Sequence, residues 1–438
     1  MKRFVVARIF LVACLSPGMG RSQSAAPSQI PTDYLNGSLP GWLKFGGEER
    51  LRFEGFSGGN FQSGNNDAYL LSRLRFNMGL LPESWLKFGF QVQDSRVGFK
   101  NLKPYAPPYQ DTFDLRIAYI EFGDSEKMPV SLRIGRQEIN LGEERLVGSS
   151  NWTNTARTFD AARLHLRKGK LRLDAFASSP VSLQDGNVGD HIPGNNLHGL
   201  YGGMDSVVPA ATIEPYFFWR LQQRLKTEAG NTGNLDEKTL GIRWVGKLPF
   251  SFDYGTEMAV QRGSLGTDDV LGFAGHWIVG NKLPLPLNPR CYLEYNYASG
   301  DGNSKDGVRR TFDQLFPSGH DKLDLADQVG WKNILHVRSG FELKPGLKWM
   351  VSARYSGYWL ADPHDALYNS SGTAIVRSVN GSAGRFVGTE FDTNFIYNYS
   401  KQFQVGAGFG HLFPGTFLEH STPGKAYTYP YLMLNTIL

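Results

Sequence analysis

The sequence is poor in cysteine, and one of its two cysteines falls in a segment that we expect to be removed. Residues 1–24 have the features of a secretory signal peptide, with a basic start, a short apolar run and small residues at the predicted cleavage point. The mature chain would then keep Cys291 alone and could form no internal disulfide. Because residues 11–14 also fit a bacterial lipoprotein cleavage site, lipidation of Cys14 is the alternative for this segment.

Long hydrophobic runs are also lacking, because no other segment offers the ~18 consecutive apolar residues that a transmembrane helix needs. An excess of charge of either sign is missing too. The 46 Lys and Arg residues against 41 Asp and Glu residues give a net charge of +5, and the basic residues are spread along the chain. This distribution disfavours nucleic acid as a partner. An exported chain without a transmembrane helix is either soluble or crosses the outer membrane as a closed β-barrel.

The sequence is rich in glycine and aromatic residues, and its side chains alternate in character. It contains 51 Gly and 13% aromatic residues, and its mean hydropathy of −0.33 is too polar for a helical membrane protein. Residues 133–166 show the repeated unit, which is an alternating strand, a long polar loop and a second alternating strand. Near the N-terminus, Leu51 and Phe53 alternate with charged residues, which a period of two places on the opposite face. The charged residues of that face are Glu48, Arg50, Arg52 and Glu54.

Two features favour a membrane barrel over a soluble sandwich. Aromatic residues lie near strand ends on the apolar face, as in the girdles of outer-membrane barrels. Short turns and long polar loops alternate strictly, as do the periplasmic turns and extracellular loops of such barrels. We therefore predict an all-β protein, a transmembrane antiparallel up-and-down β-barrel of about 18 strands. The barrel would occupy residues 42–438, after a polar periplasmic tail at residues 25–41. The girdle residues are Trp85, Trp244, Trp349, Tyr295, Tyr297, Tyr397 and Tyr399.

Three places fit the barrel pattern less well. Residues 200–207 alternate poorly, and residues 114–122 can be read in either strand register. The chain ends in Leu438, where outer-membrane barrels commonly end in an aromatic residue. The predicted closing strand, residues 427–438, still presents a mostly apolar outward face.

Motifs for other chemistry are weak or missing. Residues 301–307 partly resemble a calcium loop, but Lys305 stands where an oxygen ligand is required. The nine histidines lack the spacing of a structural metal site, and the Gly-x-Ser-x-Gly motif of esterases does not occur. Adjacent carboxylates such as Glu48 and Glu49 point to opposite faces of a strand, so they cannot act as a glycosidase pair. We therefore expect no catalytic residues, no metal and no cofactor.

A set of motifs is spread over nearly the whole mature chain. They are GRQE at residues 135–138, RLVG at 145–148, WTN at 152–154, RTFD at 157–160, ASGD at 298–301, FDQLFP at 312–317 with His320, WKN at 331–333, GTEFD at 388–392 and FPG at 413–415. Together they resemble the alginate-export family of outer-membrane porins. The resemblance implies an 18-stranded barrel whose lumen presents arginine and lysine side chains to an anionic uronate polysaccharide.

Alternation selects the side chains that we expect to face this lumen. The basic candidates are Arg50, Arg52, Arg73, Arg75, Lys87, Arg133, Arg163, Arg172, Arg243 and Arg354. Their acidic partners would be Glu48, Asp174, Asp253, Glu257, Glu294, Glu390 and Asp392. Guanidinium groups bind carboxylates through two parallel hydrogen bonds, and rings of basic side chains select anions in pores. The alternative is an arginine–carboxylate ladder that only neutralises charge inside the barrel.

A second group of charged residues lies where a strand passes into a long loop. Its members are Arg136, Glu138, Arg145, Arg157 and Asp160. If this loop folds inward, these residues would form a constriction. Otherwise the loop is an exposed hairpin held by its own ion pairs.

We expect a passive channel of the bacterial outer membrane, for the export or passage of an anionic polysaccharide or oligosaccharide such as alginate. Its partners would be outer-membrane lipid, the polymer and, for export, periplasmic machinery, because a passive pore has no intrinsic direction. A general or small-molecule uptake porin on the same barrel is the first alternative. A barrel-embedded enzyme or a secreted carbohydrate-binding β-protein is the second.

Overall fold

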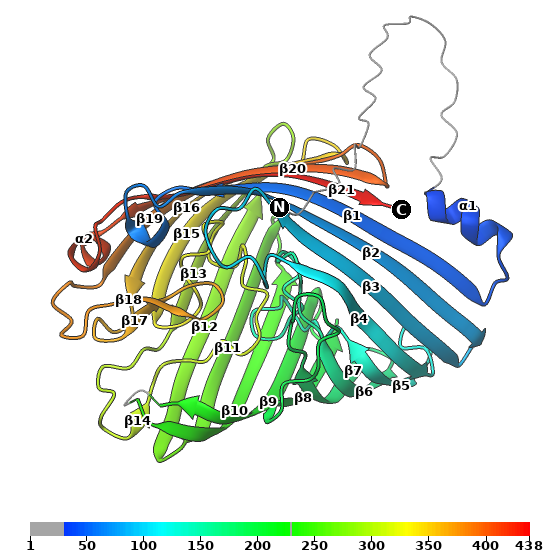
Figure 1. Cartoon of the computed structure of the whole chain (residues 1–438), viewed down its shortest axis with the longest axis horizontal. Coiled ribbons are helices and arrows are strands. Elements are labelled where there is room, and N and C mark those ends of the chain that lie inside the picture. Colours follow the sequence, from blue (N-terminus) through cyan, green and yellow to red (C-terminus); the bar gives the residue numbers. More distant parts are fainter. Residues whose placement is uncertain (1–29, 228–229) are drawn as a thin grey trace, which may run out of the picture.

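The computed structural model describes residues 30–227 and 230–438, and the predicted signal peptide lies outside these ranges. The chain forms one large antiparallel barrel (Figure 1). Its strands are β1 (Leu43–Phe56), β2 (Asp67–Glu83), β3 (Leu86–Gly98), β4 (Asp111–Phe122), β5 (Val130–Gln137), β6 (Phe159–Lys168), β7 (Leu171–Pro180), β8 (Asn195–Asp205), β9 (Ala211–Lys226), β10 (Thr232–Lys247), β11 (Phe252–Leu265), β12 (Asp268–Lys282), β13 (Arg290–Ala298), β15 (Ile334–Leu343), β16 (Trp349–Leu360), β19 (Phe386–Asn398), β20 (Phe403–Pro414) and β21 (Tyr427–Ile437).

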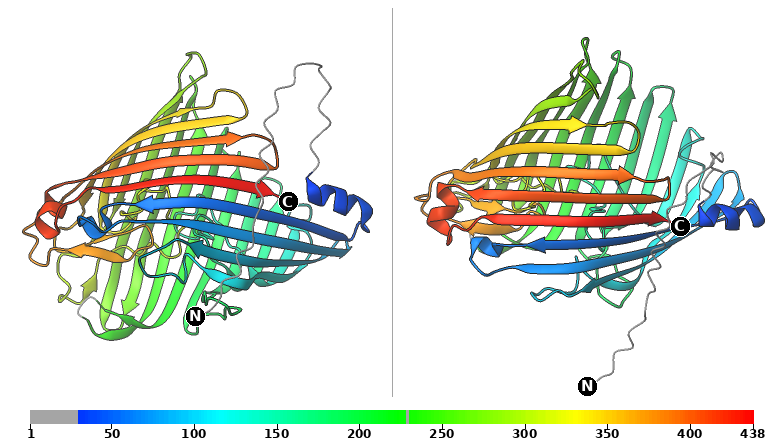
Figure 2. Two further views of the ribbon diagram at one scale, coloured as in Figure 1. Left: turned by 45° about the horizontal axis from the view of Figure 1, so that its top comes forward. Right: turned by 90° about the horizontal axis from the view of Figure 1, so that it is seen from above.

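Smaller elements lie in the connections and before the first strand. They are α1 (Pro31–Ser38), the 3-10 turn η1 (Gly59–Phe61), β14 (Val308–Arg309), the hairpin of β17 (Ala366–Tyr368) and β18 (Ala374–Arg377), and α2 (Thr416–Ser421). Figure 2 shows α2 at one end of the barrel and α1 beyond the other. Helix α1 forms within the predicted polar tail. Its Asn36 side chain donates a hydrogen bond to the carbonyl of Phe45 and accepts one from the N–H of Phe45, each at 2.8 Å. No helix in residues 30–227 and 230–438 is long and apolar enough to span a membrane.

The barrel is closed by its first and last strands. Each barrel strand pairs antiparallel with the next, and β1 pairs with β21 from Glu48 opposite Ile437 to Glu54 opposite Tyr431. Three short described strands stand outside this ring: β14 pairs parallel with β12, and β17 and β18 form a separate hairpin. The ring therefore has 18 strands, which confirms the predicted architecture.

Burial along the wall is the reverse of that in a soluble protein. On β1 the charged Arg52 is 2% exposed, whereas its apolar neighbour Phe53 is 48% exposed. Trp85, Trp244 and Trp349 are also exposed, and they lie near the ends of their strands. An apolar exterior with aromatic girdles suits lipid as the surrounding solvent. The soluble sandwich is therefore excluded.

The connections differ in length between the two ends of the barrel. At the periplasmic end all are short, from residues 84–85 to residues 399–402. At the outer end most are long, but residues 227–231 and 266–267 connect their strands with short hairpins. The predicted strict alternation of length is wrong at these two places. The strands on either side, β9 to β12, have 14 to 16 residues each. Residues that would otherwise form a long loop therefore belong to the strands.

The two weak strand predictions have local explanations. The strand expected at residues 200–207 is β8, which begins at Asn195 and so includes a better alternating start. The ambiguous register at residues 114–122 reflects a break in β4. Asp111 and Asp114 are both buried although they are three positions apart, because the register with β3 shifts there and Phe113 takes a left-handed φ of 60°. Such a bulge changes which side chains face inward.

Two long outer loops fold into the barrel. We call residues 138–158 the inner loop and residues 299–333 the long loop. Their main chains pair, since the N–H of Gly148 donates to the carbonyl of Phe316 at 2.9 Å and the N–H of Phe316 to that of Leu146 at 2.8 Å. Apolar side chains of both loops, among them Ile139 and Phe312, form a buried cluster with aromatic side chains of the wall. The barrel interior is therefore partly filled by the chain itself.

Candidate functional site: the barrel lumen

Arginine–carboxylate pairs join neighbouring strands along the inner wall. Arg133 Nη2 lies 2.6 Å from Glu121, and Arg163 Nε lies 2.9 Å from Asp174. Farther round the wall, Arg172 and Arg243 both pair with Glu214. These are the pairs that a ladder would form. The arginine side chains nevertheless stay 14–25% exposed, so one edge of each faces the lumen.

A different group of arginines is almost completely buried beneath the inner loop. We call Arg50, Arg52, Arg73, Arg75 and Arg116, from β1, β2 and β4, the arginine cluster; each is 1–5% exposed. Within it, Arg73 pairs with Glu48, Arg52 with Glu54 and Arg116 with Glu138. The predicted candidates among them thus lie together, but their guanidinium groups contact the chain instead of an open channel.

The arginine cluster holds the tip of the inner loop. Arg50 donates to the carbonyls of Asn151 at 2.9 Å, Trp152 at 3.0 Å and Thr153 at 3.0 Å. Arg52 donates to the carbonyl of Trp152 at 2.7 Å, and its guanidinium lies 3.9 Å from the Trp152 ring centroid. The loop therefore folds into the barrel, as the predicted constriction requires. It is not the exposed hairpin of the alternative prediction.

The base of the inner loop is held by further charged groups. Arg157 donates to the carbonyls of Gly148 and Phe316 at 3.0 and 2.7 Å. Glu143 accepts a hydrogen bond from Arg243 Nη2 at 2.9 Å. Burial would raise the pKa of the Glu143 carboxyl, but the nearby Arg145 and Arg243 outweigh it and lower that pKa to about 2. Glu143 is therefore ionised at neutral pH and ties the loop to the wall.

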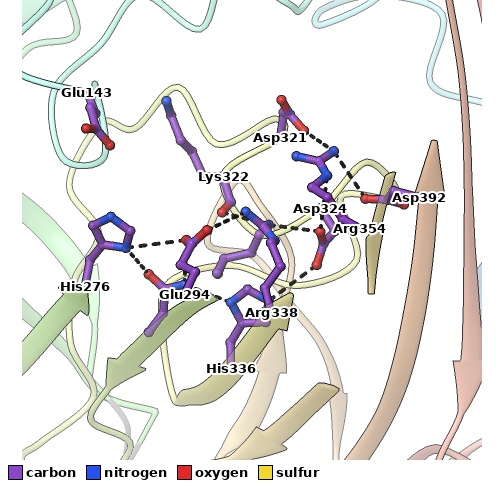
Figure 3. A network of polar contacts seen from close by, with 12 residues as sticks. Glu143, His276, Glu294, Asp321, Lys322, Asp324, His336, Arg338, Arg354 and Asp392 are labelled. Atoms are coloured by element: carbon purple, nitrogen blue, oxygen red, sulfur yellow. Dashed lines mark hydrogen bonds and ion pairs between the residues drawn. The ribbon is translucent and has the colours of Figure 1, made fainter. Parts of the chain in front are cut away.

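A second polar network anchors the long loop to β13, β15 and β16 (Figure 3). Arg338 lies between Glu294 of the wall at 2.8 Å and Asp324 of the loop at 2.9 Å. Arg354 pairs with Asp321 of the loop and lies 3.3 Å from Asp392. The predicted Arg354, Glu294 and Asp392 therefore hold a loop. Glu390 does the same, since it accepts the N–H of Ala326 at 2.9 Å.

The other predicted residues have individual partners. Arg136 Nε lies 2.9 Å from Asp160, Asp253 lies 2.6 Å from Arg290, and Glu257 accepts the Tyr216 hydroxyl at 3.1 Å. Lys87 is half-buried on β3 opposite Glu121. Sequence reasoning left out Arg116, Arg290 and Arg338. Arg338 follows His336 in an alternating strand and could have been found by the same rule, whereas the β4 bulge concealed Arg116.

Polar cavities remain in the part of the lumen that the structure describes. One of about 200 Å³ near the periplasmic end is lined by Glu121, Ser125, Ser131, Arg133, Arg163, His165 and Asp174. Another, of about 280 Å³, lies between the loops and the wall, where Tyr69, Trp152, Asp327 and Tyr429 contribute to its lining. Both cavities are lined by charged and hydrogen-bonding groups, as a channel for a polar solute requires.

An 18-stranded barrel with an apolar exterior, a polar interior and inward-folded outer loops defines the protein as an outer-membrane porin. The family described as alginate export matches residues 41–430, so the chain belongs to that family.

Solved structures with the same fold include outer-membrane proteins from Pseudomonas aeruginosa and Acinetobacter baumannii. The outer membrane protein OpdK from Pseudomonas aeruginosa is 12% identical, with a TM-score of 0.59 over 90% of this chain and 99% of that one. OccAB2 from Acinetobacter baumannii is 11% identical, with a TM-score of 0.58 over 90% and 98%. OccK11 from Pseudomonas aeruginosa is 12% identical, with a TM-score of 0.55 over 90% and 96%. No curated protein matches the sequence significantly.

Proposed function

We propose that the protein is a passive channel for an anionic polysaccharide or oligosaccharide, such as alginate, through the outer membrane. The observation that carries this proposal is the row of partly exposed arginines along the inner wall, from Arg133 through Arg163 and Arg172 to Arg243. Guanidinium groups suit the carboxylates of a uronate polymer. Membership of the alginate export family supports the same solute class.

The strand register adds weight to this interpretation. Arg133 lies directly opposite Arg163 across β5 and β6, and Arg50 lies directly opposite Arg73 across β1 and β2. Like charges in directly opposed positions destabilise a sheet. Carboxylates offset this repulsion, since Arg133 pairs with Glu121 and Arg163 with Asp174, and the wall thereby keeps two guanidinium groups side by side, as binding of a uronate carboxylate would use.

The carboxylates that pair with the wall arginines suit transport of a solute better than tight binding of it. Conduction requires binding that is weak and shared among several sites. Because Glu121, Asp174 and Glu214 already neutralise the wall arginines, a passing carboxylate would exchange with a partner instead of binding to a bare charge. The same charge balance is the observation that favours the second candidate, a general or small-molecule uptake porin.

Single-channel recording in a planar bilayer tests the proposal. We expect anion selectivity and a concentration-dependent current block by an oligomannuronate, weakened in Arg133→Ala and Arg163→Ala. The matched control is Arg96→Ala, because the Arg96 side chain is 64% exposed and pairs only with its neighbour Asp94. Conductance without anion preference or block would favour the general porin.

We also propose that residues 1–24 are a cleaved signal peptide and that residues 25–41, which include α1, form a periplasmic tail. Mass spectrometry of the protein from outer membranes tests the first point. A mature N-terminus near residue 25 is expected, whereas a lipidated N-terminal cysteine at position 14 would contradict it.

A further inference from the structure

The tip of the inner loop presents oxygen atoms to the arginine cluster as a carboxylate would. Asn151 offers both its main-chain carbonyl and its side-chain Oδ1. Arg50 and Arg73 donate to the carbonyl at 2.9 Å each, and Arg75 donates to Oδ1 at 2.8 Å. Arg73 also reaches Oδ1 at 3.2 Å. Two oxygens of one residue thus receive hydrogen bonds from three guanidinium groups, which is the arrangement that a bound carboxylate takes.

The arginine cluster has more positive charge than the chain neutralises. Among the described residues, its five guanidinium groups pair with three carboxylates, those of Glu48, Glu54 and Glu138. The remaining acceptors are neutral oxygens, those of the loop tip and those of the Gln91 and Gln93 side chains on β3. Nη2 of Arg75 and Nε of Arg50 and Arg73 are buried without a hydrogen-bond partner. A carboxylate would neutralise part of this excess charge and could accept two parallel hydrogen bonds from one guanidinium, so it would satisfy the cluster better than the neutral oxygens of Asn151 do.

Asn151 can be reached from the lumen although the arginines cannot. The residue is exposed, while each guanidinium behind it lies beneath the loop. A solute in the channel would therefore meet Asn151 first. Removing the loop tip from the cluster requires no change in the strand pairs that close the barrel.

We propose that Asn151 occupies a carboxylate-binding site formed by Arg50, Arg73 and Arg75, and that a carboxylate of the anionic solute exchanges with it. The inference rests on the proposed function, because it assigns one binding site for that solute. Asn151 then determines specificity, since only an acceptor stronger than a neutral amide displaces it. Displacement frees the tip of the inner loop and widens the path beside it.

Thiol labelling tests whether the loop tip leaves the cluster. Thr155 is 1% exposed, and its carbonyl accepts Gln93 Nε2 at 2.9 Å, so a cysteine there is hidden while the tip is bound. The experiment uses Thr155→Cys in a Cys291→Ser background, which removes the exposed native thiol. We expect an oligomannuronate to accelerate labelling by a polar maleimide about tenfold, because its carboxylate compensates positive charge that the neutral Asn151 does not. A neutral maltooligosaccharide should leave the rate unchanged.

Two substitutions of Asn151 give the decisive comparison. Asn151→Asp attaches a carboxylate of equal size to the loop, so labelling should be slow with or without the oligomannuronate. Asn151→Ala removes Oδ1 and keeps the main-chain carbonyl, so without the oligomannuronate labelling should be faster than in the parent. Asn187→Asp, in the exposed loop after β7, is the matched control and should behave like the parent.

The outcomes separate this inference from the proposed function. Current block without accelerated labelling would leave the channel proposal standing and overturn the role of Asn151. Equal labelling rates in Asn151→Ala and Asn151→Asp would also overturn it, whether or not uronates pass the channel. Slow labelling in Asn151→Asp and faster labelling in Asn151→Ala would support it even if oligomannuronate caused no block.

Discussion

At the scale of single residues, the interior depends on a few buried arginines that each serve two elements. Arg338 joins the wall to the long loop through Glu294 and Asp324, and both carboxylates are buried. Removing one member of such a set leaves an uncompensated charge, which costs far more than the net value of the pair. The position of the loop is therefore sensitive to this one side chain.

We expect Arg338→Ala to destabilise the protein by about 3–5 kcal/mol, because Glu294 loses its nearest cation and Asp324 loses one of its two. The measurement is the rate of trypsin cleavage within the long loop, together with the temperature at which the barrel changes its gel mobility. Arg96→Ala, on the surface, should change neither. Unchanged cleavage in Arg338→Ala would mean that the other contacts of the loop, such as Arg354 with Asp321 and Glu390 with Ala326, hold it without Arg338.

The pH dependence of the inner loop follows from Glu143. The pKa of the Glu143 carboxyl is lowered from 4.5 to about 2. Its ion pairs therefore stabilise the loop fully above pH 4.5, and this stabilisation is lost as the pH falls towards 2. We expect channel current noise to stay constant from neutral pH to the range near 4.5 and to rise below it. Glu143→Gln should show the raised noise at neutral pH, and Glu144→Gln is a control within the same loop. A transition near neutral pH would contradict this assignment.

At the scale of elements, the inner loop and the barrel wall are separable. The wall is closed by main-chain pairing between β1 and β21, to which the loop contributes nothing. The loop tip, in contrast, depends on side chains of the wall. Changes in the loop should therefore affect conduction before they affect folding.

We expect replacement of residues 147–155 by a short glycine–serine linker to leave the barrel folded and to raise conductance. Removal of the tip also exposes the arginine cluster, so anion selectivity should increase. Single-channel conductance and reversal potential are the measurements, and gel mobility before and after heating confirms folding. A lower conductance would show that the loop keeps the pathway open instead of narrowing it.

Alternation in the sequence was sufficient to predict the strands and the inward-facing charges, because the period of two depends only on local geometry. It placed Arg50 and Arg73 on the inner face correctly. It could not predict that these arginines bind Asn151, 101 and 78 residues away, because that contact depends on the path of a loop without periodicity. It also missed Arg116, because the bulge in β4 reverses the pattern within one strand.

At the scale of the whole molecule, stability depends on the membrane that surrounds the barrel. The outward face is apolar, and Leu74, near the middle of β2, is 48% exposed to it. A charge at that depth must be moved from water into hydrocarbon. The cost depends on depth and is largest near the middle of the bilayer.

We expect Leu74→Arg to lower the free energy of unfolding by about 2–4 kcal/mol in lipid vesicles. Leu74→Phe is the apolar control and should stay close to the parent. Denaturant titration followed by tryptophan fluorescence measures the difference. Equal stability of the two variants would place position 74 away from the hydrocarbon region.

The seam between β1 and β21 also sets the order of events in biogenesis. It joins Glu48 to Ile437, so the first strand cannot find its partner until the ribosome has finished almost the whole chain. During that interval the edge of β1 is unpaired and open to pairing with other chains. The closing pair of strands therefore makes the chain vulnerable to aggregation until β21 has been made and has found β1.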